Sequence, residues 1–230
     1  MPSNIMPEKK AIVSHLSDSP PVPLPDGRKL KIISGFAACL KDTRVSTGRD
    51  PQSGNVIDPQ KTGSWLGSIG YMVLLDQIGS CFKPKNVQLA RGNSIMKALG
   101  HFANLGNDEK QVIYALRCAL AHDYSLYNIN AKEPKLTHNF ALTKGSGFLI
   151  RMPNTQWDGN YQNRNANNQT LVDLQELGNL VENICKNLFE LANKDELEVI
   201  LTNGTDELIQ RYSFQFFESC ETPGRPESAG

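Results

Sequence analysis

Residues 109–127 read EKQVIYALRCALAHDYSLY, and this stretch decides how the middle of the chain folds. Its apolar residues recur at steps of three and four, the spacing that places side chains on one face of a helix. The residues on that face are Ile113, Leu116, Leu120, Tyr124 and Tyr127. The pattern therefore predicts an amphipathic helix that one apolar stripe holds against the core.

Two polar residues of this helix lie away from the stripe. On a wheel with about 100° per residue, Arg117 lies beside the stripe and His122 lies nearly opposite it. The two residues are about 140° apart, so an ideal helix does not stack them. Their side chains can converge if the long arginine bends, if the helix is distorted, or if a second copy of the helix completes a shared cleft.

An arginine paired with a histidine suits RNA cleavage without a metal. The attacking 2′-hydroxyl must lose a proton and the leaving oxygen must gain one, and histidine can do either near neutral pH. Negative charge grows on the phosphoryl oxygens, and an arginine fork is shaped to hold it. We therefore expect Arg117 to clamp the phosphate and His122 to act as acid or base, with Asp123 and Tyr124 as supporting residues.

The pattern Arg117-x4-His122-x-Tyr124 resembles the Arg-x(4–6)-His signature of the HEPN superfamily, in the form with a trailing tyrosine found in HEPN toxins. The resemblance is sharp over residues 109–127 and is one of helical architecture elsewhere. It implies a mainly α fold, a HEPN-like helical bundle with a small β-hairpin insertion. It further implies a homodimer through the motif helix and a metal-independent endoribonuclease, without cofactor, in a toxin or anti-phage defence role. An antitoxin or nucleotidyltransferase partner that modifies Tyr124 with AMP is also implied.

Simpler interpretations of the same residues stay open. Active HEPN members commonly have a polar residue after the motif arginine, and Cys118 stands there, which favours an inactive HEPN-like scaffold or interaction module. Tyr124 suits a core or interface position, and His122 an ordinary surface position. Arg117 suits an ion pair with a carboxylate such as Asp123 or one from another helix. Cys118 and His122 could together touch a metal or form a nucleophile pair, but no further ligands accompany them, so we expect no metal site.

The remaining chain is expected to form one domain. Residues 1–27 are predicted to be a partly flexible N-terminal arm because four prolines interrupt residues 17–27. Residues 28–220 are predicted to be a single HEPN-like helical domain, and residues 221–230 a disordered tail.

Apolar spacing also predicts the elements of this domain. Helices are expected at Leu30–Lys41, Ser64–Phe82, Asn93–Leu105 and Thr170–Lys194, and one more helix or a helix-turn pair from Asp195 to Ser219. A β-hairpin is expected at about residues 136–152, turning at Gly145-Ser146-Gly147. The polar loop 42–63 carries Arg44 and Arg49, and it is either simply solvated or in contact with a polyanion.

Composition limits the classes of function. The 24 basic and 24 acidic residues balance, which argues against a broad basic surface for nucleic acid, so any RNA contact must use a local patch. The five cysteines are odd in number and form no CxxC pair, which argues against a disulfide framework or a zinc site. No secretory signal is visible, and the apolar stretch 69–82 is too short to span a bilayer. We therefore expect a cytoplasmic protein with an RNA substrate and no membrane contact.

Overall fold

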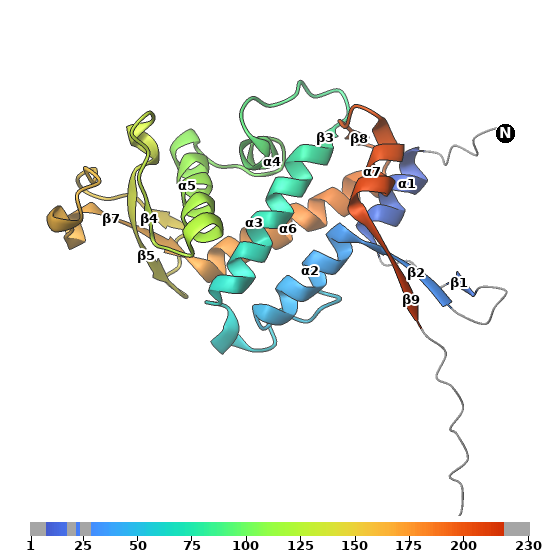
Figure 1. Ribbon diagram of the computed structural model, residues 1–230, viewed down its shortest axis with the longest axis horizontal. Coiled ribbons are helices and arrows are strands. Elements are labelled where there is room, and N and C mark those ends of the chain that lie inside the picture. Colours follow the sequence, from blue (N-terminus) through green and yellow to red (C-terminus); the bar gives the residue numbers. More distant parts are fainter. Residues whose placement is uncertain (1–7, 18–21, 24–28, 219–230) are drawn as a thin grey trace, which may run out of the picture.

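The computed structural model describes residues 8–17, 22–23 and 29–218. Seven α-helices lie in these residues: α1 (Glu8–Leu16), α2 (Gly35–Ser46), α3 (Trp65–Cys81), α4 (Ser94–Phe102), α5 (Asn107–Asp123), α6 (Leu174–Asn193) and α7 (Gly204–Tyr212). Helices α3 and α6 cross near the centre, and α5 lies beside a sheet at one end of the molecule (Figure 1). Among the described residues, no helix has the length and apolar character needed to cross a membrane.

Three small sheets accompany the helices. The first has the order β1-β2-β9, the second pairs β3 with β8, and the third has the order β4-β5-β7-β6. Their strands are β1 (Val22–Pro23), β2 (Lys29–Ser34), β3 (Phe82–Pro84), β4 (Tyr127–Asn128), β5 (His138–Thr143), β6 (Ile150–Arg151), β7 (Gln169–Asp173), β8 (Leu197–Val199) and β9 (Ser213–Glu218). The prediction of a mainly α bundle is therefore wrong, because the fold is mixed α/β.

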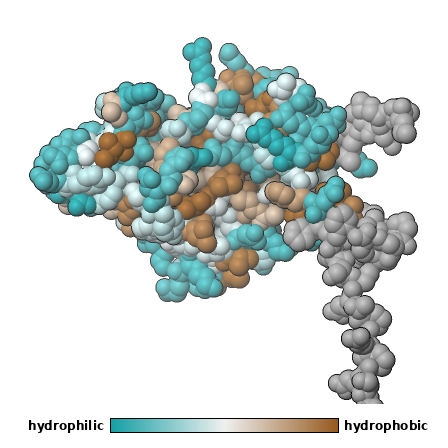
Figure 2. All heavy atoms as spheres, in the orientation of Figure 1, coloured by the Kyte–Doolittle hydropathy of each residue, from teal (hydrophilic) through white to brown (hydrophobic). Residues whose placement is uncertain are grey.

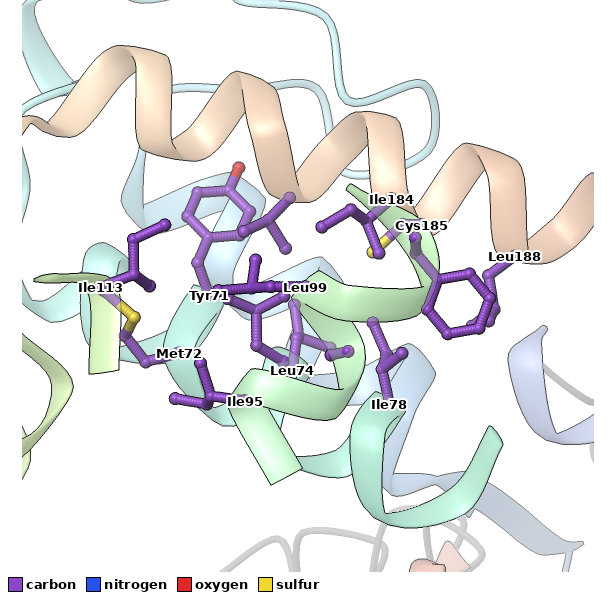
Figure 3. Packing of buried hydrophobic residues seen from close by; sticks show 14 of the residues in the cluster. Tyr71, Met72, Leu74, Ile78, Ile95, Leu99, Ile113, Ile184, Cys185 and Leu188 are labelled. Carbon is purple, nitrogen blue, oxygen red and sulfur yellow. The ribbon is translucent and has the colours of Figure 1, made fainter. Parts of the chain in front are cut away.

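The hydrophobic core gathers around α3. Leu74, Leu75 and Ile78 of this helix have no exposed surface, and side chains from α4, α5 and α6 converge on them (Figure 3). Helix α3 approaches α4 so closely that a Cβ on Gly79 would lie 1.7 Å from the carbonyl oxygen of Ser94. The backbones themselves are therefore in contact at this crossing.

The predicted β-hairpin at residues 136–152 is wrong. Strand β7 lies between β5 and β6, pairing with β5 in parallel and with β6 in antiparallel orientation. Gly145 and Gly147 do reverse the chain, with φ of +69° and +76°. The turn was therefore placed correctly, but it connects two strands that a third strand separates.

Two segments that were predicted to be helical throughout contain a strand followed by a helix. The segment Leu30–Lys41 contains the end of β2 and the start of α2, and the segment Thr170–Lys194 contains most of β7 before α6. The side chains of Ser34 and Asp173 cap the two helices by accepting backbone N–H groups of the first turn. In the second segment Val172 of β7 and Leu174 of α6 belong to the same core, so the apolar spacing continues through the junction. In the first segment Phe36 and Leu40 of α2 belong to the core, whereas Ile32 of β2 is 41% exposed, so apolar spacing alone did not separate strand from helix.

The two ends of the chain also differ from expectation. Part of the expected N-terminal arm forms α1, whose Ala11, Ile12 and Leu16 are buried in the core. The last predicted helix, from Asp195 onward, is instead β8, α7 and β9. The predicted tail 221–230 lies outside the described residues. Short 3₁₀ turns complete the described structure, at Pro59–Lys61, Pro134–Leu136, Tyr161–Asn163 and Ala166–Asn168.

Candidate active site at the end of helix α5

Helix α5 carries the predicted motif on its last two turns. Its buried face packs against the core through Val112, Ile113, Leu116 and Leu120. The helix ends at Asp123, four residues before the predicted end, because Tyr124 adopts a left-handed conformation with φ of +47°. The motif therefore lies where the helix stops and the chain turns toward the third sheet.

The side chains of Arg117 and His122 meet. Arg117 Nη1 lies 3.2 Å from His122 Nε2, and His122 is exposed at the helix end. Arginine has only donors, so Nε2 accepts in this contact and the ring proton lies on Nδ1. Of the three routes by which the pair could converge, the chain by itself uses the first, since the long arginine side chain reaches along the helix.

Asp76 of α3 holds the same arginine from the other side. Its Oδ2 lies 3.0 Å from Arg117 Nε and 2.9 Å from Nη2, and both side chains are about one-third exposed. Of the expected alternatives, the ion pair of Arg117 with a carboxylate from another helix forms, and the pair with Asp123 does not. Asp123 is exposed without a hydrogen bond or ion pair in the described residues. The sequence offered one signal for Asp76, because it is a single acidic residue in an otherwise apolar helix.

Tyr124 lies on the surface rather than in the core. Its side chain is 55% exposed, and its ring centroid lies 5.5 Å from that of Trp65, the first residue of α3. The core position that the apolar stripe predicted for Tyr124 is wrong, because the left-handed turn carries the side chain off the helix face. Its side chain therefore lies at the surface beside Trp65.

Cys118 is half-buried and belongs to neither a metal site nor the Arg117–His122 pair. Its thiol is a hydrogen-bond partner of Tyr114, and this contact raises the pKa of the tyrosine. Within the part of the chain that the structure describes, no cluster of three or more histidine, cysteine or acidic side chains is arranged to hold a metal.

An aromatic cluster follows the motif directly. Tyr127 of β4 lies 5.8 Å from Trp157 and 5.2 Å from Tyr161 between ring centroids, and Arg164 covers both tyrosine rings. Trp157 is buried, whereas Tyr161 is 52% exposed. Aromatic faces next to arginine are surfaces on which unpaired bases stack. Residues 153–168 are polar and rich in asparagine, a composition typical of a loop, but the two aromatic residues and the arginine within them were a usable signal.

Comparison with protein families, curated proteins and solved structures gives no match for this chain. The functional assignment therefore depends on the geometry of the α5 site and on the resemblance of its motif. What the geometry offers is an exposed histidine acceptor, a guanidinium in contact with it, and an aromatic surface a few residues further along the chain.

Proposed function

We propose that this protein is a cytoplasmic, metal-independent endoribonuclease of the HEPN type, in a toxin or anti-phage defence role. The observation that carries the proposal is the 3.2 Å contact between Arg117 Nη1 and His122 Nε2 at an exposed helix end. It supplies a proton acceptor and a phosphate-binding cation within one contact.

The reaction follows from these two side chains. When Arg117 Nη1 turns from His122 to the phosphate, the freed His122 Nε2 takes the proton of a 2′-hydroxyl, whose oxygen attacks the adjacent phosphorus while the bond to the 5′ oxygen breaks. The products are a 2′,3′-cyclic phosphate and a 5′-hydroxyl end. Arg117 neutralises the charge that grows on the phosphoryl oxygens. Asp123 and Tyr124, the two exposed residues that follow His122, would be the supporting residues of the site.

The leaving oxygen needs a proton that a single unprotonated histidine does not supply. A second copy of the chain, packed through α5, would bring a second His122 and a second Arg117 into one cleft. The neighbouring helix α3 favours such an interface, because Leu66 is 67% and Val73 48% exposed. Apolar side chains gather over α3 in the middle of the face shown in Figure 2. A second chain that buried these exposed apolar side chains would gain the free energy that usually drives association.

Single-stranded RNA is the substrate that the surroundings favour. The exposed Tyr161, with Tyr127 and Arg164, offers a stacking surface for unpaired bases. Tyr127 follows His122 by five residues, so even a fully extended chain would separate them by no more than about 17 Å. A strand held on the aromatic cluster would therefore pass close to the Arg117–His122 pair.

The test is RNA cleavage in EDTA by the full chain and by the variants His122→Ala and Arg117→Ala. We expect each variant to lose activity by about 10²-fold or more, because each removes a group that acts in the transition state. His101→Ala and Arg91→Ala are the matched controls and should cleave normally. Cleavage that persists in His122→Ala, or that requires a divalent metal, would exclude the proposal.

A second candidate is an inactive scaffold. The favouring observation is that Asp76 already occupies Arg117, so a phosphate would have to compete for the guanidinium. This candidate predicts no cleavage of any RNA and a stable protein complex through the exposed face of α3. Leu66→Asp would then abolish the complex, whereas cleavage that depends on His122 would rule the scaffold out.

A nucleotidyltransferase antitoxin is the partner that the motif favours. Tyr124 offers it an exposed side chain next to the catalytic pair, so that an AMP group there would cover the RNA site. Intact-mass measurement after co-expression with such an enzyme should show the added AMP on the native chain and not on Tyr124→Phe. An unmodified native chain would argue against this partner.

A further inference from the structure

A second site lies away from the motif, in a cleft between α2, residues 49–55 and α6. Its volume is about 890 Å³, which is in the range of cavities that hold small molecules. Lys41 and Arg44 line it from α2, and Asn183 and Lys186 line it from α6. None of these residues belongs to the Arg117–His122 site.

Arg49 is the unusual group of this cleft. It is only 5% exposed, yet no carboxylate of the described residues lies within ion-pair distance of it. Nη1 donates to the carbonyl of Gly54 and Nη2 to Asn179 Oδ1, but the buried Nε has no acceptor among the residues that the structure describes. Asn179 in turn donates to Glu176 Oε2, so this carboxylate reaches Arg49 only through an amide. A buried cation without a directly bound counter-charge is costly, so the position favours an anion bound in the cleft.

Arg44, unlike Arg49, has a carboxylate partner. Its Nε and Nη2 contact both carboxylate oxygens of Glu182, and Nη1 donates to the carbonyls of Pro51 and Gln52. These hydrogen bonds attach the loop to α2 and, through Glu182, to α6. The cleft is therefore preorganised, which lowers the cost of binding a ligand there.

The other residues that line the cleft indicate the chemical groups of its ligand. Lys41 and Lys186 are exposed and add positive charge to that of Arg49. The side-chain amides of Asn55, Asn183 and Asn193 have no hydrogen-bond partner in the described part of the chain, so they are available to bind hydroxyl groups. Glu176 and Glu190 also line the cleft and suit hydroxyl donors rather than a second anion.

We propose that this cleft binds a phosphorylated sugar, either free or as part of a nucleotide. The phosphate would offset the charge of Arg49, Lys41 and Lys186, and the amide groups would hold the sugar hydroxyls. The proposal is independent of the ribonuclease activity, because the two sites share no residue.

Calorimetric titration of the full chain with ribose 5-phosphate, AMP, ribose and inorganic phosphate tests it. Ribose 5-phosphate or AMP should bind saturably and at least about tenfold more tightly than ribose or phosphate alone. Tighter binding of AMP than of ribose 5-phosphate identifies the nucleotide as the source, and equal binding identifies the free sugar phosphate.

Asn183→Asp and Asn187→Asp form the matched pair of variants. Both residues are exposed on α6, so neither change should disturb folding, but only Asn183 lines the cleft. Asn183→Asp should weaken binding by about tenfold through charge repulsion, and Asn187→Asp should leave it within about twofold. The proposal is overturned if neither phosphorylated compound binds, if phosphate alone binds equally well, or if both variants bind like the native chain.

Discussion

The carboxylate of Asp76 on α3 lies 2.9 Å from Nη2 and 3.0 Å from Nε of Arg117 on α5, leaving Nη1 to contact His122. An arginine held along one edge of its fork keeps the other edge in a fixed direction. Asp76 therefore positions Arg117 for the proposed reaction while also competing with phosphate for its charge. Positioning should raise the rate of RNA cleavage, whereas competition with phosphate should lower it. A variant at Asp76 shows which of the two effects is larger.

Asp76→Asn should lower kcat for RNA cleavage by about tenfold, because Arg117 loses its charged anchor and its orientation. The thermal stability should change little, since partly exposed ion pairs contribute about 1 kcal/mol or less. Asp76→Glu should restore part of the activity. If Asp76→Asn instead cleaves faster than the native chain, competition with phosphate outweighs positioning, and the role assigned to Asp76 would be wrong.

His15 should make folding stability depend on pH. It is 3% exposed, with Nδ1 3.4 Å from Ser34 Oγ and Nε2 3.2 Å from Gln77 Nε2, and burial lowers its pKa from 6.5 to about 4. The unfolded chain therefore binds the proton more readily than the folded chain. The contribution to stability is present above pH 6.5 and is lost as the pH falls toward 4, by about 2 kcal/mol at pH 5.

Urea unfolding of the native chain and of His15→Gln at pH 7 and pH 5 checks this. Glutamine keeps polar groups near Ser34 and Gln77 but does not titrate in this range. The native chain should lose about 2 kcal/mol more than the variant between the two pH values. Equal losses in both proteins would show that His15 does not carry the pH dependence.

The sequence located the motif helix well because local spacing determines it. Helix α5 buries Ile113, Leu116 and Leu120, three residues of the predicted stripe, and exposes His122 as the wheel requires. The spacing could not foresee the left-handed Tyr124, since a non-glycine residue with positive φ has no strong local signal. Tyr124 therefore lies at the surface and not in the core, where the apolar stripe predicted it.

Non-local pairing explains most of the other differences. Strand β5 pairs in parallel with β7, whose Gln169 lies opposite Asn139, 30 residues away in the chain. A neighbouring turn at Gly145 suggests a hairpin by itself, and nothing in residues 136–152 reports the third strand. The same holds for Asp76 and Arg117, which are 41 residues apart and meet only through the packing of α3 against α5.

Asp173 should be one of the most sensitive polar positions. It has no exposed surface, and its two oxygens accept the backbone N–H groups of Gln175 and Glu176 and both the N–H and hydroxyl of Ser146. Asp173→Ala should cost about 3 kcal/mol, since it removes the cap of α6 and leaves four part-buried hydrogen bonds without their acceptor.

Chemical denaturation of Asp173→Ala beside Asp58→Ala measures this effect. Asp58 caps only the short turn at 59–61 and is partly exposed, so its loss should cost about 1 kcal/mol or less. If both variants lost a similar free energy of unfolding, the burial of Asp173 and its contacts with Ser146 would add nothing to its effect as a helix cap.

Gly79 should tolerate no side chain, because α3 and α4 touch there through their backbones. A Cβ at this position would lie 1.7 Å from the carbonyl oxygen of Ser94 and 2.8 Å from the backbone nitrogen of Ala98. Neither atom is the end of a flexible side chain, so the helices must move apart and core contacts are lost. Gly79→Ala should therefore destabilise the protein by about 3 kcal/mol or more.

Gly63→Ala is the control for this prediction. The nearest atom to a Cβ there is the flexible Lys144 Cδ at 3.4 Å, so the substitution should change stability by less than about 1 kcal/mol. Both variants are compared by their denaturation midpoints and by the near-ultraviolet circular dichroism of the folded state. A Gly79→Ala protein as stable as Gly63→Ala would mean that α3 and α4 do not pack backbone to backbone, and the core around Leu74 and Ile78 would have to be arranged differently.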